Sequence, residues 1–203
     1  MTRAFSDKEK ESIRAALLEK GREMFGVYGL KRTGVAELAQ AVGIAPGSFY
    51  SFFGSKEELL FAVMEEEEKQ IHSHFASLLS GELTREKLKR LLVEGVAVAD
   101  ANLIVRQLLD PEVYQRVIRK LPEEKIREHI ERDRDVLAPL VESWQAAGQM
   151  KSYSPDVVSG LLRGIFVLAL HKKEIGEEIF ADVVDLLAEL VATGLVKGEK
   201  DND

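Results

Sequence analysis

Residues 33–56 read TGVAELAQAVGIAPGSFYSFFGSK, and their order gives the clearest structural signal in the N-terminal part of the chain. Apolar side chains recur at three- and four-residue spacing from Val35 to Val42, which is typical of a helix with one apolar face. Thr33 has the side chain of a good N-cap, and Glu37 suits the positive start of such a helix. The first half of the stretch therefore predicts a short amphipathic helix.

The second half predicts a sharp turn and another short helix. Gly43 tolerates the left-handed backbone of a turn, and Pro46 costs no hydrogen bond in a first helical turn, so this helix should begin near Ala45. Phe49 and Phe53 lie four residues apart and should face inward. The residues left on or near the outer face are Gly47, Ser48, Ser51 and Phe52, with Tyr50 at its edge. A helix that starts with small residues can enter a major groove roughly 12 Å wide, which predicts a helix-turn-helix that binds DNA.

The order of these residues resembles the DNA-binding domain of the TetR family of bacterial regulators. The resemblance is carried by Thr33, by the pair Val35-Ala36, by VGIAPGSFYSFF at 42–53 and by SKEEL at 55–59. Two positions depart from the family pattern, because Ala45 replaces its usual serine and Phe52 replaces a common histidine or tyrosine. These motifs cover about the first quarter of the chain.

This interpretation predicts a homodimeric, ligand-released repressor that places one recognition helix per subunit in successive major grooves of a palindromic operator. The residues assigned to phosphates are Arg32, Thr33, Tyr50 and Lys56. The residues that approach the bases are Pro46, Gly47, Ser48, Ser51 and Phe52, and Ala45 is a further residue of the expected DNA-binding surface. Double-stranded DNA is therefore the first expected partner.

The charge distribution agrees with this interpretation once the chain is divided. The whole sequence of 203 residues has a net charge of −7, which on its own does not favour nucleic acid. Residues 1–56 carry nine Lys or Arg against six Asp or Glu, for +3, and the remainder carries 19 against 29, for −10. A basic N-terminal part on an acidic body directs one end of the protein toward phosphate.

The rest of the sequence has helical periodicity and no strand pattern, which predicts an all-α fold of nine or ten helices. The predicted domains are a DNA-binding domain at 1–54 and an effector-binding and dimerisation domain at 55–203, joined by a long helix at about 55–79. The other predicted helices span 7–27, 84–102, 103–109, 111–121, 122–148, 155–172 and 177–195.

The last two predicted helices are apolar on more than one side, so a single core cannot bury all of their side chains. The TetR resemblance implies that this helix pair forms a four-helix bundle with a second copy, and the excess apolar surface favours the same homodimer. The candidate interface residues are Gly160, Gly164, Val184, Leu187 and Val191. Packing within one subunit is the alternative role of the two glycines.

A ligand pocket is predicted in the C-terminal body. Trp144 and Phe166 could supply apolar walls, and Arg106 could supply one cation for the polar end of a mainly apolar effector. The alternative is that Trp144 belongs to the core and that Arg106 pairs with a surface carboxylate. A regulator without a small-molecule effector is the second possible function.

Other classes of function find little support in the sequence. No nucleophile elbow, phosphate loop or cysteine nucleophile is present, so an enzyme hidden in the helical body is the remote alternative and no catalytic residue is assigned. The absence of cysteine and of a His-Glu-x-x-His motif leaves no expected metal site or cofactor. The N-terminus has no continuous apolar segment and no apolar run could span a bilayer, so we expect a cytoplasmic protein without a membrane partner.

Overall fold

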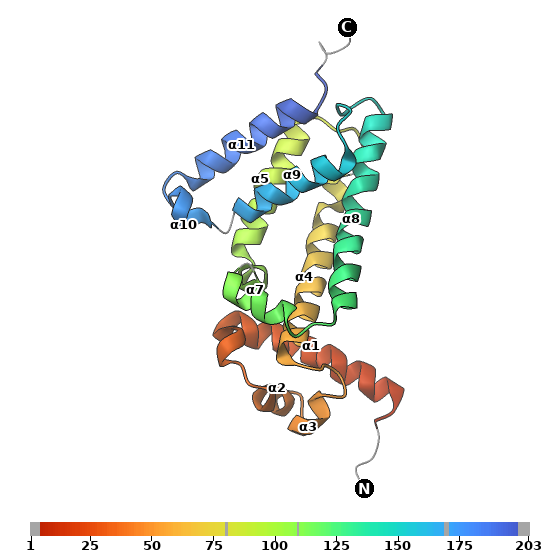
Figure 1. Ribbon diagram of the computed structural model, residues 1–203, viewed down its shortest axis with the longest axis vertical. Helices are drawn as coiled ribbons and strands as arrows, with labels where there is room; N and C mark the ends of the chain where they lie inside the picture. Colours follow the sequence, from red (N-terminus) through yellow and green to blue (C-terminus); the bar gives the residue numbers. More distant parts are fainter. Residues whose placement is uncertain (1–4, 80, 109, 169–170, 199–203) are drawn as a thin grey trace. The chain divides into compact units, whose positions relative to one another are not determined.

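The computed structural model describes residues 5–79, 81–108, 110–168 and 171–198, and it confirms the predicted all-α fold (Figure 1). Among these residues the extended pairing is limited to an isolated bridge between Met150 and Val196. The chain divides into two compact units. The first unit is Met1–Gln70 with Leu103–Pro122, and the second is Ile71–Asn102 with Glu123–Asp203.

The first unit holds the predicted helix-turn-helix together with a segment from the middle of the chain. Its helices are α1 (Asp7–Arg32), α2 (Val35–Ala41), α3 (Pro46–Phe49), the first part of α4 (Lys56–Leu79), α6 (Leu103–Leu108) and α7 (Pro111–Ile118). This unit is larger than residues 1–54, because α6 and α7 and the start of α4 pack into it. The functional boundary at residue 54 stays a prediction.

Helix α1 begins at a capping box and is interrupted near its end. The backbone N–H of Glu9 donates to Ser6 Oγ at 3.3 Å, and the backbone N–H of Ser6 donates to the Glu9 carboxylate at 2.8 Å. Gly29 has φ 74° and ψ 166°, so it breaks the helix as its residue type predicts. The chain nevertheless makes a further helical turn to Arg32, which the predicted end at residue 27 missed.

The second unit is a bundle of α5 (Arg85–Ala101), α8 (Glu123–Ala146), α9 (Pro155–Leu168), α10 (Lys172–Ile175) and α11 (Phe180–Leu195). Helix α5 packs against both α9 and α11, and α8 packs against α9 (Figure 1). Helix α5 contacts α9 at Gly95, where a Cβ atom would collide with the ring of Phe166. The core side chains include Leu92, Val96, Trp144, Leu162, Val184, Ala188 and Val191.

Two helix boundaries of this unit differ from the prediction. The predicted helix at 155–172 ends at Leu168, and residues 169–170 lie outside the described residues. The short helix α10 follows in the described part of the chain, which thus contains more helices than the predicted nine or ten, and Gly176 with φ 112° ends α10. The last helix therefore begins at Phe180 rather than at Glu177.

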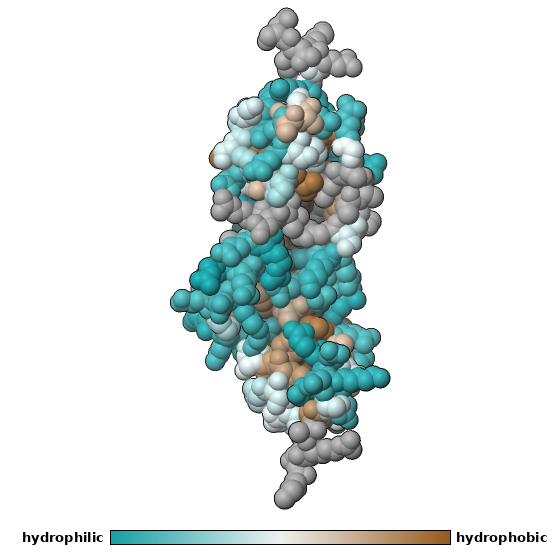
Figure 2. All heavy atoms as spheres, turned by 90° about the vertical axis from the view of Figure 1, so that its right-hand side faces the viewer, coloured by the Kyte–Doolittle hydropathy of each residue, from teal (hydrophilic) through white to brown (hydrophobic). Residues whose placement is uncertain are grey.

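Hydrophilic side chains cover most of the face shown in Figure 2, where apolar atoms form smaller patches. This agrees with a sequence in which 31% of the residues are charged. Within the described part of the chain, no helix has the length and the apolarity needed to cross a membrane. The same residues contain no cluster of three His, Asp or Glu side chains placed to hold a metal ion.

Candidate DNA-binding site

The turn between α2 and α3 has the geometry that its sequence predicts. Gly43 adopts φ 74°, and an added Cβ would meet no atom within 4 Å, so the backbone conformation rather than space requires glycine here. The backbone N–H of Ile44 donates to Ala39 O at 3.0 Å and closes the turn. Ala45 is the N-cap of α3, and Pro46 occupies its first turn. These observations confirm the predicted start of the second helix.

The inner side of α3 is anchored by two aromatic rings. The side chains of Phe49 and Phe53 are 0% and 2% exposed, and their ring centroids lie 6.1 Å apart. The guanidinium of Arg14 on α1 lies 4.9 Å from the centroid of the Phe53 ring, where a cation is attracted to the aromatic face. The inward orientation of both phenylalanines is confirmed, and it fixes which side of α3 faces outward.

The outward side carries the residues that the sequence assigned to bases, together with Ala45. Ala45, Pro46, Gly47 and Ser51 are exposed, and Ser48 and Phe52 are half-buried. Tyr50, assigned to a phosphate, is 60% exposed. The regular α-helix covers only Pro46–Phe49, and turn-like bonds such as Phe52 N–H to Phe49 O at 2.9 Å continue it. The structure thus brings the predicted base-facing set together on one exposed surface, whose contact with DNA stays a prediction.

Phe52 has a neighbour that sequence reasoning missed. The ring of Phe5 lies 6.0 Å from that of Phe52 at an interplanar angle of 48°. Phe5 precedes the N-cap of α1, so it carries no periodic signal by which the sequence could have revealed the contact. The ring of Phe52 therefore packs against the chain's own N-terminal segment as well as lining the outer face.

Thr33 does not have the predicted role of N-cap. Its side chain is 1% exposed, and its hydroxyl donates to Gly29 O at 2.9 Å, so it closes the end of α1. The N-cap of α2 is Gly34, whose N–H donates to the Glu37 carboxylate at 2.9 Å. The prediction was wrong because the extra turn of α1 draws the threonine back onto the preceding carbonyl. A buried, engaged hydroxyl also argues against a side-chain contact with phosphate.

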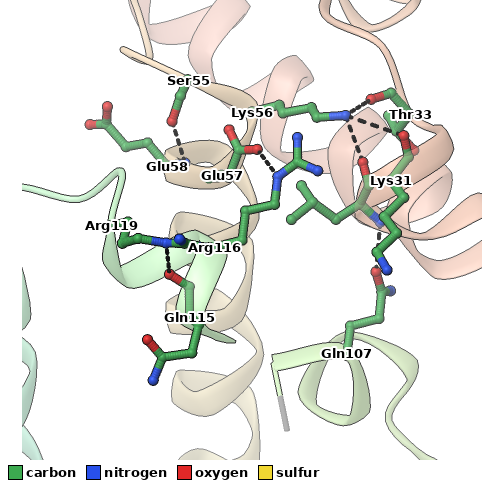
Figure 3. A network of polar contacts seen from close by, with 11 residues as sticks. Lys31, Thr33, Ser55, Lys56, Glu57, Glu58, Gln107, Gln115, Arg116 and Arg119 are labelled. Carbon is green, nitrogen blue, oxygen red and sulfur yellow. Dashed lines mark hydrogen bonds and ion pairs between the residues drawn. The ribbon is translucent and has the colours of Figure 1, made fainter. Parts of the chain in front are cut away.

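Lys56 lies at the start of α4, and its ammonium is engaged within the protein (Figure 3). Its Nζ donates to Leu30 O and to Thr33 O, each at 2.7 Å, so it caps the carbonyl end of α1. Burial lowers the pKa of Lys56 from its usual 10.5, and the nearby positive charge of Arg116 lowers it further. The geometry supports a structural role, and the assigned phosphate contact stays a prediction.

The basic end of α1 is exposed. Arg32 lies in the last turn of α1, and its Nε donates to Tyr28 O at 3.2 Å. The neighbouring Lys31 forms an exposed ion pair with Glu112 of α7, with 2.6 Å between nitrogen and oxygen. Of the four residues assigned to phosphates, Arg32 and Tyr50 are thus the two with exposed side chains.

The residues of the predicted ligand pocket fall into different units. Arg106 is exposed on α6 of the first unit. Trp144 is 6% exposed in the core of the second unit, and the half-buried ring of Phe166 packs against that core. A role of Trp144 in the core is therefore observed, and a ligand role for any of the three residues stays a prediction.

The candidate dimer residues divide between two faces of their helices. Val184 and Val191 are only 5% and 8% exposed, because they pack into the core of their own subunit, and Leu187 is half-buried against that core. These three residues therefore contact the core of their own subunit, and their role in a dimer interface stays a prediction. Gly160 and Gly164 are exposed with no atom within 4 Å of an added Cβ. The apolar residues exposed on α9 and α11 are Val157, Leu161, Val167, Leu186 and Leu190.

The chain is similar in sequence to known proteins. The profile of the bacterial regulatory proteins of the tetR family matches residues 17–63. The HTH-type transcriptional repressor KstR2 of Mycobacterium tuberculosis is 28% identical over 120 residues, which are 59% of this chain. The chain matches 58% of the length of that relative.

Solved structures share the fold over nearly the whole chain. A TetR-family transcriptional regulator from Pectobacterium atrosepticum has a TM-score of 0.74 at 20% identity, with 96% of this chain and 99% of that chain covered. The regulator FadR from Bacillus subtilis, in complex with stearoyl-CoA, has a TM-score of 0.63 at 17% identity, with 89% and 98% covered. The profile match runs from within α1 to the first part of α4 and contains the helix-turn-helix described above, so the N-terminal part of the chain is similar to the DNA-binding region of the tetR family of bacterial regulatory proteins.

Proposed function

We propose that the protein is a DNA-binding transcription regulator whose reading surface is the outward side of α3. The observation that carries this proposal is that Ala45, Pro46, Gly47 and Ser51 are exposed and Ser48 is half-buried beside them, on the side opposite the buried rings of Phe49 and Phe53. Small and hydroxyl side chains at the start of a helix let its backbone approach the floor of a major groove, where base edges are distinguishable. The relative KstR2 is named a repressor, which favours repression as the outcome.

Phosphate contacts would fix the position of this surface on the duplex. Arg32 and Tyr50 are exposed and lie at the end of α1 and directly after α3, so they are the favoured candidates. Neutralisation of a phosphate by the guanidinium of Arg32 would release counterions and make binding depend on salt, whereas the uncharged hydroxyl of Tyr50 would donate a hydrogen bond. Base contacts, in contrast, would come from Ser48 and Ser51.

The proposed regulator acts as a homodimer. Leu186 and Leu190 on α11 are 60% and 61% exposed, and Val157 on α9 is 63% exposed. Burial of one such side chain stabilises an assembly by about 1.5–3 kcal/mol, so a second copy is a favourable partner for these faces. Two copies related by a two-fold axis would present two α3 helices to half-sites about 34 Å apart on a palindromic operator.

The proposed regulator releases DNA when it binds a mainly apolar small molecule in its second unit. FadR of Bacillus subtilis, which shares the fold, was solved with stearoyl-CoA, and this favours an effector with a large apolar part. By linkage, the effector should bind the free protein more tightly than the DNA complex, by the factor with which it weakens operator binding. Trp144 fluorescence is the probe of choice because Trp144 is the chain's single tryptophan.

Selection from a random duplex library, followed by fluorescence anisotropy, tests the proposal. We expect enrichment of a palindrome with half-sites about one helical turn apart, and affinity that falls with rising salt. The control is a duplex of the same length with scrambled half-sites. Equal affinity for the selected and scrambled duplexes at physiological salt would contradict sequence-specific regulation.

A further inference from the structure

The break in α1 is bridged by a side chain from the middle of the sequence. Gly29 leaves helical geometry, which interrupts the backbone hydrogen-bond ladder at this point. The carboxamide of Gln107 on α6 spans the break: its Oε1 accepts from Leu30 N–H at 3.0 Å, and its Nε2 donates to Phe25 O at 2.6 Å. A backbone N–H and a carbonyl on either side of the break are thus both satisfied by one side chain.

The turn beyond the break is held from a second direction. Lys56 of α4 donates to Leu30 O and Thr33 O, so Leu30 is bound through its N–H by α6 and through its carbonyl by α4. The next residue, Glu57, is 4% exposed and accepts from Nε of Arg116 at 2.7 Å, which ties the start of α4 to α7 (Figure 3). The last turn of α1 is therefore held by side chains of α4 and α6 as well as by the Thr33 hydroxyl on Gly29 O.

This turn leads directly into the reading element. Residues 30–32 end α1, and α2 begins at Val35, so only Thr33 and Gly34 separate the bridged turn from the helix-turn-helix. A change in direction of the turn is consequently passed to α2 and α3. Helix α6 carries Gln107, and only Asn102 separates it in the sequence from α5. Gln107 is therefore close along the chain to a helix of the second unit.

We propose that Gln107 is a positioning residue for the DNA-reading surface, and that its carboxamide closes the break in α1 and thereby sets the direction of α2 and α3. As far as DNA is concerned, this inference rests on the proposed function. It makes the DNA-binding unit depend on α6, which the predicted domain of residues 1–54 does not contain.

Hydrogen exchange at the Leu30 amide, followed by NMR on the full-length protein, tests the bridge without DNA. In Gln107→Leu we expect this amide to exchange at least tenfold faster, because an open break exposes it to water. The matched control is Gln115→Leu, which removes an exposed glutamine on α7 and should leave the rate unchanged. An unchanged rate in folded Gln107→Leu would overturn the proposal.

A second variant separates the hydrogen bonds from packing and covers the case in which Gln107→Leu does not fold. Gln107→Glu keeps the acceptor for Leu30 N–H, but above the pKa of the new carboxyl it places an anion against Phe25 O. When the carboxyl is protonated, it can donate to that carbonyl again. The ratio of Leu30 exchange rates in Gln107→Glu and wild type should therefore fall toward one as the pH is lowered from 8 to 5. A ratio independent of pH would contradict the bridge.

DNA binding then tests the positioning role. For the duplex selected with the wild type, Gln107→Leu should weaken binding about tenfold and leave the salt dependence unchanged, because no phosphate contact is removed. Faster Leu30 exchange with unaltered affinity would show a bridge without a role in positioning and would overturn the proposal. If the wild type binds no duplex, the proposed function fails, and the exchange experiments still decide whether Gln107 closes the break.

Discussion

The helix-turn-helix of the first unit and the helices α9 and α11 of the second unit use apolar residues in different ways. In α3 and the turn that follows it, Phe49 faces the core and residues such as Gly47 and Ser51 face outward, so each position has one role. Along α11 the apolar residues occupy two faces, with Val184 at 5% and Leu186 at 60% exposure. The buried and exposed faces of a helix can therefore be predicted from sequence where they carry different residue types, and cannot be told apart where both faces are aliphatic.

The largest effect is expected from a substitution in the core of the helix-turn-helix. Phe49→Ala should destabilise the protein by about 3–5 kcal/mol, because the ring is fully buried and its loss leaves a cavity. Tyr50→Ala, one residue further along at 60% exposure, should change the stability little. Denaturant unfolding followed by circular dichroism measures both. Similar losses in the two variants would contradict the division of α3 into an inner and an outer face.

The second effect separates the two faces of α11. Leu186→Glu should leave the subunit folded and convert a dimer into monomers, whereas Val184→Glu should unfold the subunit, because it buries an unpaired charge at a cost of several kcal/mol. Sedimentation and circular dichroism distinguish the outcomes. Val27→Glu on α1 is the control, since Val27 is 67% exposed outside this helix pair. A folded, dimeric Leu186→Glu protein would place the interface elsewhere.

A third, smaller effect tests which cations of the first unit reach phosphate. Arg32→Ala should reduce the slope of log affinity against log salt by about one unit, because one counterion-releasing contact is lost. Lys56→Ala should instead lower the melting temperature and leave that slope unchanged, since the Lys56 ammonium caps carbonyls of α1. Anisotropy over a salt series measures the slopes. A reduced slope for Lys56→Ala would restore this lysine to the phosphate contacts.

The smallest effect compares one lysine from each unit. Burial lowers the pKa of Lys56, whereas hydrogen bonds to Asp185 and Glu189 raise the pKa of Lys89 above 10.5. The contribution of Lys89 to stability is thus present below pH 10.5 and is lost as the pH rises through its higher folded pKa. For Lys56 the sign is opposite, and the free energy of unfolding rises between its lowered pKa and 10.5. Carbon-13 NMR of the lysine side chains should find Lys56 titrating before Lys89, and the reverse order would contradict this.

Much of the first unit could be predicted because its signals are local. Glycine is favoured at a positive φ, and proline is favoured in the first turn of a helix. The observed turn has Gly43 at φ 74° and Pro46 in the first turn of α3. The role of Thr33 could not be predicted, because it depends on the extra turn of α1 beyond Gly29. Gln107 is 77 residues from Leu30 in the sequence, and no periodicity indicates such a contact.

In the second unit the sequence predicted that α9 and α11 carry more apolar residues than one core can bury, but it did not predict which face of each helix is exposed. Val184 and Leu186 are both aliphatic residues of one helix, and only the packing of α11 on α5 decides which of them is buried. The same reason explains why Trp144 could not be assigned from sequence to core or pocket. Helix ends such as Phe180 depend on the short α10, which has no strong start signal.

Titration of the selected duplex into isotope-labelled protein tests whether the outward side of α3 contacts DNA. We expect the amide chemical-shift changes to concentrate in residues 45–52 and at Arg32, and the amides of α9 and α11 to change little in comparison. Changes centred on α9 or α11, or no changes at physiological salt, would contradict the assignment of the outward side of α3 as the DNA-reading surface.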